Sequence, residues 1–550
     1  MQDQDKPRVA YFCMEYGLDD SLHIYCGGLG ILAGDYLKAA KDLGLPVVGI
    51  GILWRQDYTN QYVGVDGWPY DIYKTYDFDF LKDTGVTIQV RVRGTDVTCK
   101  VWKADQFENA PLYLLDAGYP DTPNGWMTSK LYGGVEQDRL ANEIILGIGG
   151  VRALRALGID VDLYHFNEGH AVFAGFELIR EKMALGMDFE KALNTTRKEI
   201  IFTTHTPVMA GNESHDIGLI QYMEANNGLN YEQLKRLGDD PFNMTIAGLR
   251  MAYLANGVSK LHTKTANRMW EHIQDRARII CITNGVHVKT WQDPRIRLAY
   301  ERNEDLWQPH MEIKKELIQF VKDITGRELN PETLTIGFAR RAAPYKRGEL
   351  IFRNADAIEP LFREGKLQLI FSGKAHPNDN PGKEIVQKLV QMSRKYPENV
   401  IFLENYDMSI CKHLISGCDI WLNNPKRPLE ASGTSGMKAA VNGVLNLSVV
   451  DGWVAEGPEH EVSGWLIDEV FKSLPEKETE DEKDLQALYH LLYENVIPTY
   501  YKDRERWVNM MRASIEMASY QFSAQRMIKD YYEKMYKPAY QAQKESAVTV

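Results

Sequence analysis

Short runs of apolar residues alternate along most of the chain with longer segments in which apolar positions recur every three or four residues. The short runs predict buried strands, and the longer segments predict helices. In the first half we expect parallel strands at 8–13, 46–53, 163–167, 199–204 and 279–283, with helices such as 136–157 and 168–185 between them. This alternation predicts an α/β fold with helices on both faces of a parallel sheet.

Residues 86–116 follow a different pattern. The sequences VTIQVRVRG and VTCKVWKA alternate between apolar and polar residues, which is typical of strands with one exposed face. We therefore expect an antiparallel ribbon inserted in the first domain.

A second set of buried strands begins near Thr333. The runs LTIGFA, LQLIFSG, NVIFLEN, CDIWLNN and VLNLSVV are separated by helical segments and predict a second parallel sheet. Further on, the segment PEKETEDEKD at 475–484 is too polar for a core, so we expect a solvated loop there.

Composition narrows the possible functions. The chain has 550 residues and a net charge of −12, which disfavours nucleic acids and anionic membranes as partners. Its six cysteines form no Cys-x-x-Cys pair, and no segment resembles a signal peptide or a membrane span. We expect a reduced, cytoplasmic protein in which any site for an anion is a local positive pocket.

The most informative segment is RPLEASGTSGMK, residues 427–438, where a lysine follows a Gly/Ser/Thr turn at the predicted start of a helix. Backbone N–H groups there can bind a phosphate, and Lys438 can bond an aldehyde. Pyridoxal 5′-phosphate (PLP) offers both groups. A helix start with an exposed lysine is the alternative that these residues leave open.

Several segments in the same order resemble motifs of the α-glucan (glycogen, starch and maltodextrin) phosphorylase family. Glu430–Lys438 resembles the cofactor-lysine motif of that family. The other matching segments are Cys26–Gly30, His205–Pro207, Thr283–Gly285 with Trp291, Tyr345–Arg347 and Phe402–Tyr406. Together they are far more specific than any single glycine loop.

The resemblance implies a fold and an activity. The fold would be the glycosyltransferase type B fold, two facing Rossmann-like domains with the active site in the cleft between them. The expected limits are 1–295 for a glucan-binding domain, 296–484 for a PLP- and phosphate-binding domain, and 485–550 for helices that cross back to the first. The activity would be retaining phosphorolysis of α-1,4-glucans to glucose 1-phosphate, with glycogen, starch or maltodextrin and inorganic phosphate as partners.

The resemblance also implies site residues. Lys438 would anchor PLP, with further cofactor contacts from Thr434, Gly28, Arg340, Tyr406 and Trp291. Arg341 and Lys346 would bind the substrate phosphate. Sugar contacts would come from Asn284, His205, Glu430, Ser432, Gly433 and Gly27, and the carbonyl rather than the imidazole of His205 could face C1. The catalytic set would be Lys438, Arg341, Lys346 and His205. Glu168 and His170 lack an evident third ligand, so we expect no metal.

This chain departs from the better-known phosphorylases at five positions. Cys26 replaces a polar residue, and Glu168 stands where aspartate is usual. Ala343 replaces a histidine, Asp407 an arginine and Gly436 an asparagine. The changes at 343 and 407 remove polar or positive character near phosphates.

Two other functions stay open. A nucleotide-sugar glucan synthase on the same fold would place glutamates eight residues apart in the lysine loop, whereas here Glu430 is followed by Lys438. A catalytically weak glucan-binding or regulatory homologue is the second. The family suggests a homodimer, and the absence of a long N-terminal extension suggests an enzyme without allosteric control.

Overall fold

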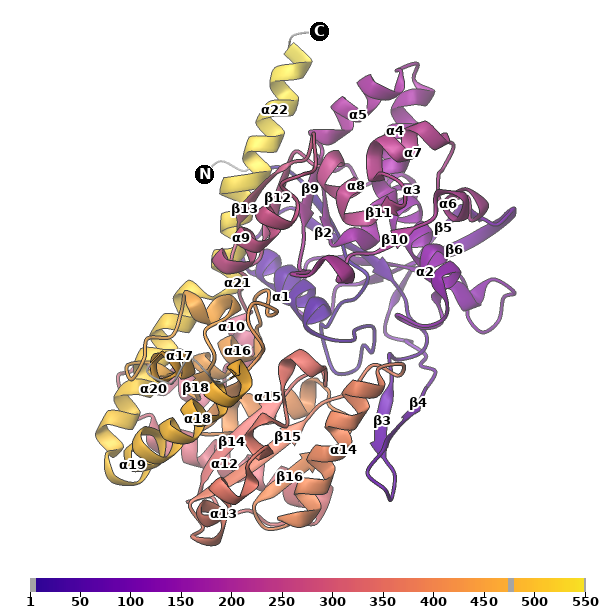
Figure 1. The fold of residues 1–550 in the computed structure, drawn as a ribbon. Coiled ribbons are helices and arrows are strands. Elements are labelled where there is room, and N and C mark those ends of the chain that lie inside the picture. The colour runs from indigo at the N-terminus through magenta and orange to yellow at the C-terminus, as the bar shows by residue number, and fades with distance from the viewer. Residues whose placement is uncertain (1–5, 473–478, 549–550) are drawn as a thin grey trace. The chain divides into compact units, whose positions relative to one another are not determined.

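The computed structural model describes residues 6–472 and 479–548, and its contacts divide the chain into two compact units. Unit 1 comprises Met1–Tyr58, Tyr73–Asn284 and Ala524–Val550, and unit 2 comprises Thr59–Ile72 and Gly285–Ser523. Each unit has its own large sheet with helices around it (Figure 1). The predicted α/β class with two sheets is confirmed.

The described part of unit 1 holds a nine-stranded sheet in the order β13-β12-β9-β8-β1-β2-β7-β6-β5. Its strands are β1 (Val9–Phe12), β2 (Val47–Ile52), β5 (Lys82–Val92), β6 (Thr95–Ala104), β7 (Leu112–Asp116), β8 (Leu163–Asn167), β9 (Ile200–Thr203), β12 (Leu254–Gly257) and β13 (Arg278–Cys281). The five strands predicted for the first half are confirmed, and β12 was not predicted.

Residues 82–116 form antiparallel pairs, β5 with β6 and β6 with β7. Side chains of β5 alternate between exposed and buried toward its end, as its sequence pattern indicates. However, β7 pairs in parallel with β2, so this ribbon continues the main sheet at its edge.

The sheet of unit 2 is parallel, with six described strands in the order β16-β15-β14-β17-β18-β19. They are β14 (Leu334–Ala339), β15 (Leu367–Ser372), β16 (Val400–Leu403), β17 (Ile420–Asn423), β18 (Leu445–Ser448) and β19 (Gly464–Leu466). Every residue of β14, β15 and β17 is buried, because helices cover both faces of a parallel sheet. All five predicted strands are present.

A hairpin from the N-terminal part of the sequence belongs to unit 2. Its strands β3 (Asn60–Val63) and β4 (Pro69–Ile72) lie beside helix α14 (Asn380–Lys395) (Figure 1). Asp71 pairs with Lys383 at 2.9 Å. The Gln61 side chain both donates to and accepts from the backbone of Ala375. The hairpin is therefore fastened by polar contacts.

The prediction of a solvated loop at 475–484 is wrong for residues 479–484, and residues 475–478 lie outside the described part. Thr479 caps helix α18 (Glu480–Leu491) through a reciprocal capping box with Glu482. Asp484 is fully buried and pairs with Arg347 at 2.6 Å. The Asp484 carboxylate can be buried because Arg347 and Arg427 form ion pairs with it.

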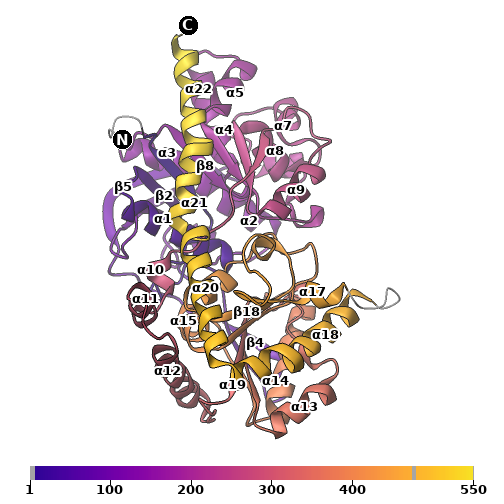
Figure 2. The ribbon, with the colours of Figure 1, turned by 90° about the vertical axis from the view of Figure 1, so that its left-hand side faces the viewer.

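The C-terminal helices divide between the units. Helix α20 (Arg504–Gln521) packs in unit 2 on α16 (Ser435–Val441), whereas α21 (Ala524–Tyr531) packs on α1 (Gly28–Asp42) of unit 1 (Figure 2). A π-helical turn, Tyr532–Tyr536, connects α21 to α22 (Lys537–Val548). The Tyr536 hydroxyl lies 2.6 Å from the Tyr36 hydroxyl and 2.6 Å from His165 Nδ1.

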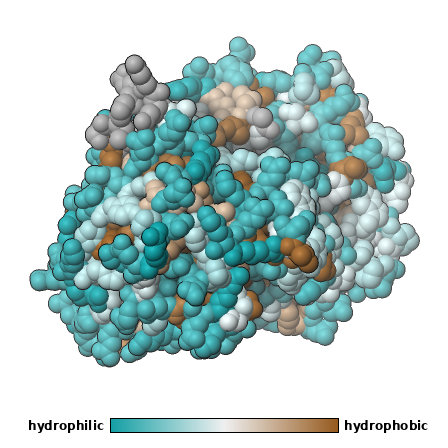
Figure 3. All heavy atoms as spheres, turned by 60° about the horizontal axis from the view of Figure 1, so that its bottom comes forward, coloured by the Kyte–Doolittle hydropathy of each residue, from teal (hydrophilic) through white to brown (hydrophobic). Residues whose placement is uncertain are grey.

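The surface and the cysteines of the described residues show no sign of membrane insertion or of disulfide bonding. On the face in Figure 3, apolar residues lie scattered between polar ones, which is ordinary for a protein surface. Within the described residues, no helix has the length and apolar character that a bilayer span requires. None of the six cysteines, all within the described residues, forms a disulfide.

Candidate functional site

The lysine loop connects β17 to helix α16 in unit 2. Lys438 lies one turn into α16, as predicted, and only 4% of the residue is exposed. Its Nζ lies 3.8 Å from the ring centre of Trp291, which ends helix α10 (Val288–Trp291). None of the described carboxylates pairs with this ammonium group. The alternative of an exposed lysine is therefore wrong.

A buried ionic cluster lies on the same loop. The Glu430 carboxylate accepts from Arg340 Nη2 at 2.7 Å and from Lys346 Nζ. Arg340 also donates to Asn423 at the end of β17. Because β14 and β17 are neighbours in a parallel sheet, the turns at their carboxyl ends bring these groups together.

Charge keeps Glu430 ionised in this cluster. Burial alone would raise its pKa, but Lys346 and Arg340 outweigh burial through charge and hydrogen bonds and lower the pKa to about 2. Asp451 accepts from the Glu430 backbone N–H at 2.9 Å. Burial raises the pKa of Asp451 to about 6, with the charge of Glu430 adding to the rise. An anionic ligand that binds here would interact with Arg340 and Lys346, whose positive charge Glu430 already partly neutralises.

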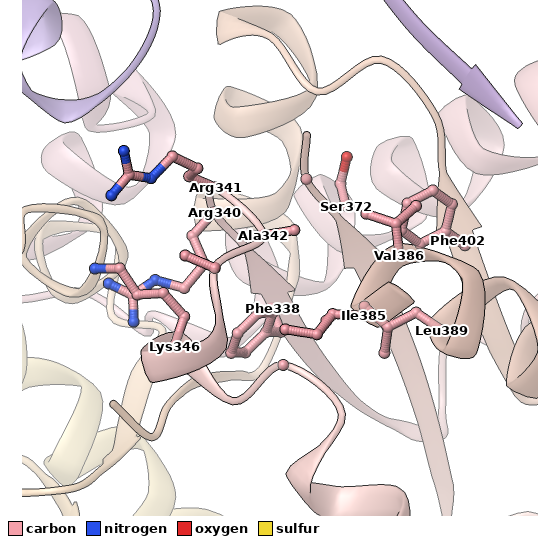
Figure 4. Close-up of a pocket in the computed structure, with 13 residues that line it drawn as sticks. Phe338, Arg340, Arg341, Ala342, Lys346, Ser372, Ile385, Val386, Leu389 and Phe402 are labelled. Atoms are coloured by element: carbon pink, nitrogen blue, oxygen red, sulfur yellow. The ribbon is translucent and has the colours of Figure 1, made fainter. Parts of the chain in front are cut away.

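A pocket lies next to the cluster in the same unit, as Figure 4 shows. Arg340, Arg341 and Lys346 contribute to its lining but point their nitrogens away from the apolar side chains that surround the pocket, including Phe338, Ile385 and Leu389. Arg341 is exposed, whereas Lys346 is 7% exposed. The pocket itself is therefore apolar, and the cationic groups gather beside it on the turn after β14.

Asp484 ties the two turns that carry these cations and the lysine loop. Arg347 follows Lys346 and donates to Asp484 and to the backbone oxygen of Asn424. Arg427, which begins the lysine loop, pairs with Asp484 at 2.9 Å and with Asp468 at 2.8 Å. This buried carboxylate holds both turns in place.

The remaining predicted residues of unit 2 lie in or beside the loop. Thr434 is the N-cap position of α16, and Ser432 and Gly433 precede it, with Gly433 at a φ of +77°. Ser432 is buried, and its carbonyl accepts from Trp453. Tyr406 follows β16 and is half-buried. Contacts of a ligand with these residues stay predictions.

In unit 1 the first glycine loop precedes helix α1. The buried Glu15 carboxylate accepts from the backbone N–H groups of Cys26 at 2.6 Å and Gly27 at 3.0 Å. Apart from the adjoining backbone, no atom of the described residues lies within 4 Å of the place that a Cβ would take at Gly27 or at Gly28. The loop is thus held by one carboxylate and has open space on its outer side.

His205 follows β9 and is held from two sides. Its Nε2 lies 2.7 Å from Asn167 Oδ1, and its backbone N–H donates to Glu168. Burial lowers the pKa of His205 to about 3, with help from His262 and His170. Since the amide oxygen of Asn167 accepts, the neutral ring carries its proton on Nε2 and leaves Nδ1 as an acceptor.

Asn284 ends the segment after β13. It is 4% exposed, and its Oδ1 is buried without a hydrogen-bond partner among the described residues. Its backbone is fixed, because its N–H donates to Val258 and its carbonyl accepts from Arg526. A buried unpaired amide oxygen is costly unless a ligand hydroxyl donates to it.

In unit 2 the structure therefore brings Arg340, Lys346 and Glu430 into contact. In unit 1 the His205 and Asn284 side chains do not bond to each other: His205 bonds to Asn167, and Asn284 Oδ1 has no described partner. Four residues that hold the predicted ones were not predicted from the sequence: Asn423, Asp451, Glu15 and Asn167. Asn423 ends β17, Asn167 ends β8, and Asp451 comes soon after β18, so their position at strand ends was a usable signal.

Comparison with known proteins identifies relatives of this chain. A family model described as carbohydrate phosphorylase matches residues 295–461. The chain is 40% identical to maltodextrin phosphorylase of Thermococcus litoralis, over 96% of this chain and 70% of that protein. The chain belongs to the carbohydrate phosphorylase family. It is also 37% identical to glycogen phosphorylase of Mycobacterium tuberculosis and 34% identical to that of Aquifex aeolicus, over 72% and 87% of those proteins.

Membership in this family confirms the resemblance found in the sequence. The structure explains two of the five positions at which the chain departs from the better-known phosphorylases. Asp407 is the N-cap of helix α15 (Met408–Gly417) and accepts from the Ile410 N–H at 2.9 Å. Any side chain at Gly436 would come within 2.4 Å of Asn446 Oδ1 and 2.9 Å of the Trp453 ring. This family member therefore uses position 407 to cap a helix and needs glycine at 436.

Proposed function

We propose that the protein is an α-1,4-glucan phosphorylase, which transfers the terminal glucosyl group of glycogen, starch or maltodextrin to inorganic phosphate. The observation that carries the proposal is the buried Lys438 without a carboxylate partner, in a chain whose relatives are named maltodextrin and glycogen phosphorylases. The product would be glucose 1-phosphate with the α configuration retained.

The residues around Lys438 fit PLP. A desolvated lysine beside an indole ring, with no described acid to neutralise it, is suited to bond an aldehyde. Lys438 would hold the ring, with Trp291 and Tyr406 as walls and Thr434, Arg340 and Gly28 as predicted contacts. When bound, PLP supplies a phosphate group that shares charge or exchanges a proton with the substrate phosphate.

Arg341 and Lys346, whose nitrogens point to the same side of the turn after β14 (Figure 4), would bind the substrate phosphate. Lys346 is already desolvated and oriented by Glu430, so it loses little freedom on binding. Glu430 limits how strongly a free anion is held, because it neutralises one of the neighbouring charges. Arg341 is the cation most available to a ligand from solvent.

The neutral sugar would be bound by neutral groups. The unpaired Oδ1 of Asn284 can accept from a hydroxyl, and Nδ1 of the uncharged His205 can do the same. Glu430, Ser432, Gly433 and Gly27 complete the predicted sugar contacts. The predicted limits 1–295, 296–484 and 485–550, the homodimer and the cytoplasmic location belong to the same proposal.

The decisive assay is formation of glucose 1-phosphate from maltodextrin with phosphate present and absent. We expect product only with phosphate and, in reverse, primer extension from glucose 1-phosphate. Transfer from ADP- or UDP-glucose with none from glucose 1-phosphate would favour the synthase. Glucan binding with no transfer from any donor would favour the regulatory homologue, which the Ala343 replacement keeps open.

The cofactor has a test of its own. After borohydride reduction, peptide mapping should find the pyridoxyl mass on the peptide that contains Lys438. Lys438→Ala should lose cofactor and activity together, whereas Lys315→Ala, an exposed lysine of the same unit, should keep both. Full activity with unmodified Lys438 would reject the assignment.

The phosphate site predicts a third result. Arg341→Ala and Lys346→Ala should each lower kcat/KM by an amount equivalent to a loss of roughly 3 kcal/mol of transition-state stabilisation, while PLP stays bound. Arg363→Ala, whose side chain is 74% exposed, is the matched control. Near-normal phosphorolysis by both variants would show that the phosphate binds elsewhere.

A further inference from the structure

A second polar cluster lies in unit 1, outside the residues assigned above. It consists of Glu143 on helix α2 (Glu136–Ile144), and Glu213 and His215 at strand β10 (Ser214–His215). One ligand atom from each residue lies within 4.8 Å of the other two. The cluster joins two elements that are far apart in sequence.

Two of these three side chains are buried and carry polar atoms that no described donor or acceptor satisfies. Glu143 is 1% exposed, and its carboxyl group lies close enough to that of Glu213 to share a proton with it, while His215 is 2% exposed with an unpaired Nε2. Glu143 Oε2 lies 3.9 Å from His215 Nε2, too far for a hydrogen bond. Unpaired polar atoms in such a position are costly unless something binds them.

The orientation of His215 is set from its other side. Its Nδ1 lies 2.7 Å from Glu136 Oε1, so this nitrogen donates and Nε2 presents its lone pair to Glu143. Glu136 and Glu143 are seven residues apart and therefore lie on one face of α2. A carboxylate that orients a histidine in this way is the usual second layer of a metal site.

We propose that Glu143, Glu213 and His215 bind one divalent cation of the Zn²⁺ class. Zn²⁺ takes imidazole nitrogen and carboxylate oxygen at about 2.0–2.2 Å, so a 3.9 Å separation of two ligand atoms can be bridged by one ion. Glu213 is the least buried ligand, and a shift of under about 1 Å in its carboxylate would bring it to bonding distance. Arg139 already pairs with Glu213 Oε1 at 2.7 Å and so helps to hold this carboxylate beside the cluster.

The cation would act on the position of the His205 segment. That segment leaves β9, passes His205 and reaches β10 at Ser214. A metal would fasten its far end to α2, while Glu168 and Asn167 hold its near end. The role is therefore structural positioning of the segment, and no substrate contact is assigned to the ion.

The alternative occupant of the site is a proton. Burial raises the pKa of Glu143 well above its usual value, and the charge of Glu213 adds to the rise. A protonated Glu143 would remain in the fold without a metal. Glu143→Gln imitates that neutral form in shape, so it should fold whichever occupant is correct.

The test is a titration of the full chain with Zn²⁺ after EDTA treatment and desalting, followed by metal analysis. We expect one Zn²⁺ per wild-type chain, and at least a 100-fold weaker site in Glu143→Gln and in His215→Gln. Glu136→Gln, with a half-exposed side chain, should weaken binding 10- to 100-fold. His272→Gln, outside the cluster, should bind as the wild type does.

Two further readouts separate the metal from a structural effect of the mutations. Zn²⁺ should slow hydrogen exchange in residues 205–215 of the wild type and not in Glu143→Gln, and Mg²⁺ and Ca²⁺ should bind more weakly because a nitrogen ligand does not suit them. Equal Zn²⁺ binding by wild type, Glu143→Gln and His215→Gln would overturn the proposal. So would a wild-type protein that binds no Zn²⁺, which would leave Glu143 as a protonated acid.

Discussion

The two units keep polar groups in their interiors by different means. In unit 1, His165 is fully buried and uncharged, because burial lowers its pKa to about 3, and it bonds to Thr203 and Tyr536. In unit 2, buried carboxylates pair with cations that are buried as well, as in Asp419 with Lys314 and Asp484 with Arg347. Buried Glu177 of unit 1 pairs instead with arginines that are partly exposed.

This difference matches the ligands proposed for each unit. A neutral sugar is bound well by neutral hydrogen-bonding groups, whereas a phosphate needs desolvated cations that are already in position. Unit 2 holds its cations with carboxylates, so their desolvation is completed during folding. The comparison predicts that removing a buried carboxylate from unit 2 costs more than neutral changes in unit 1.

The largest effect on stability is expected for Asp484→Ala. It would remove the buried carboxylate that Arg347 and Arg427 share, leaving Arg347 with Asp481 alone among the described carboxylates, and breaking a buried ion pair costs about 3–5 kcal/mol. Urea unfolding at neutral pH measures the loss. Gln486→Ala, an exposed position on the same helix, should change it by less than about 0.5 kcal/mol. Equal effects of the two variants would contradict the role of Asp484.

Glu430→Gln should cost somewhat less, roughly 3 kcal/mol at pH 7, from a folded pKa of about 2 against about 4.3 unfolded. Because the folded pKa is lowered, this contribution is complete above the unfolded pKa and disappears as the pH falls toward 2. The difference in unfolding free energy between wild type and variant should therefore shrink below about pH 4. A difference independent of pH would indicate that Glu430 contributes by packing alone.

The neutral interior of unit 1 can be tested with His165→Gln. The depressed pKa means that stability is complete above about pH 6.5 and is lost as the pH falls toward 3, by about 2 kcal/mol at pH 5. The variant should lack this loss, so the comparison with wild type at pH 7 and pH 5 isolates it from other groups. The same loss in both proteins would contradict a neutral buried His165.

Asn284→Ala should have the smallest effect on folding, within about 0.5 kcal/mol, because its Oδ1 has no partner to lose. Its effect on activity should be larger, with a raised KM for maltodextrin. Asn256→Ala is the contrast, since Asn256 accepts from Thr203 and should lose stability. A marked loss of stability in Asn284→Ala would show that the residue serves the fold.

The sequence predicted strands well where four to six apolar residues stand together, because burial on both faces leaves that pattern. It missed β12 and β19, whose short segments LANG and GWL carry too few apolar residues. Residues 479–484 were predicted to form a loop, because the polarity of the segment does not reveal that Asp484 pairs with two arginines in the folded chain.

Much of the candidate site was accessible for a different reason. Lys438, His205 and Asn284 came from motifs; Lys438 and Asn284 are buried and His205 is half-buried. The ionic partners did not come from motifs, since Glu430 meets Lys346 across 84 residues of sequence. The Glu143, Glu213 and His215 cluster was missed likewise, because only the packing of α2 beside β10 brings its members together.

The discontinuous composition of the units has a consequence for synthesis on the ribosome. Unit 1 contains the first residues of the chain, yet it also requires Ala524–Val550, which are translated after all of unit 2. Until then Tyr36 and His165 lack the Tyr536 hydroxyl that bonds to both. The unit begun first is therefore finished last, so the nascent chain must carry an N-terminal unit that lacks its C-terminal helices while the second sheet forms, and a chaperone would have most to protect in that interval.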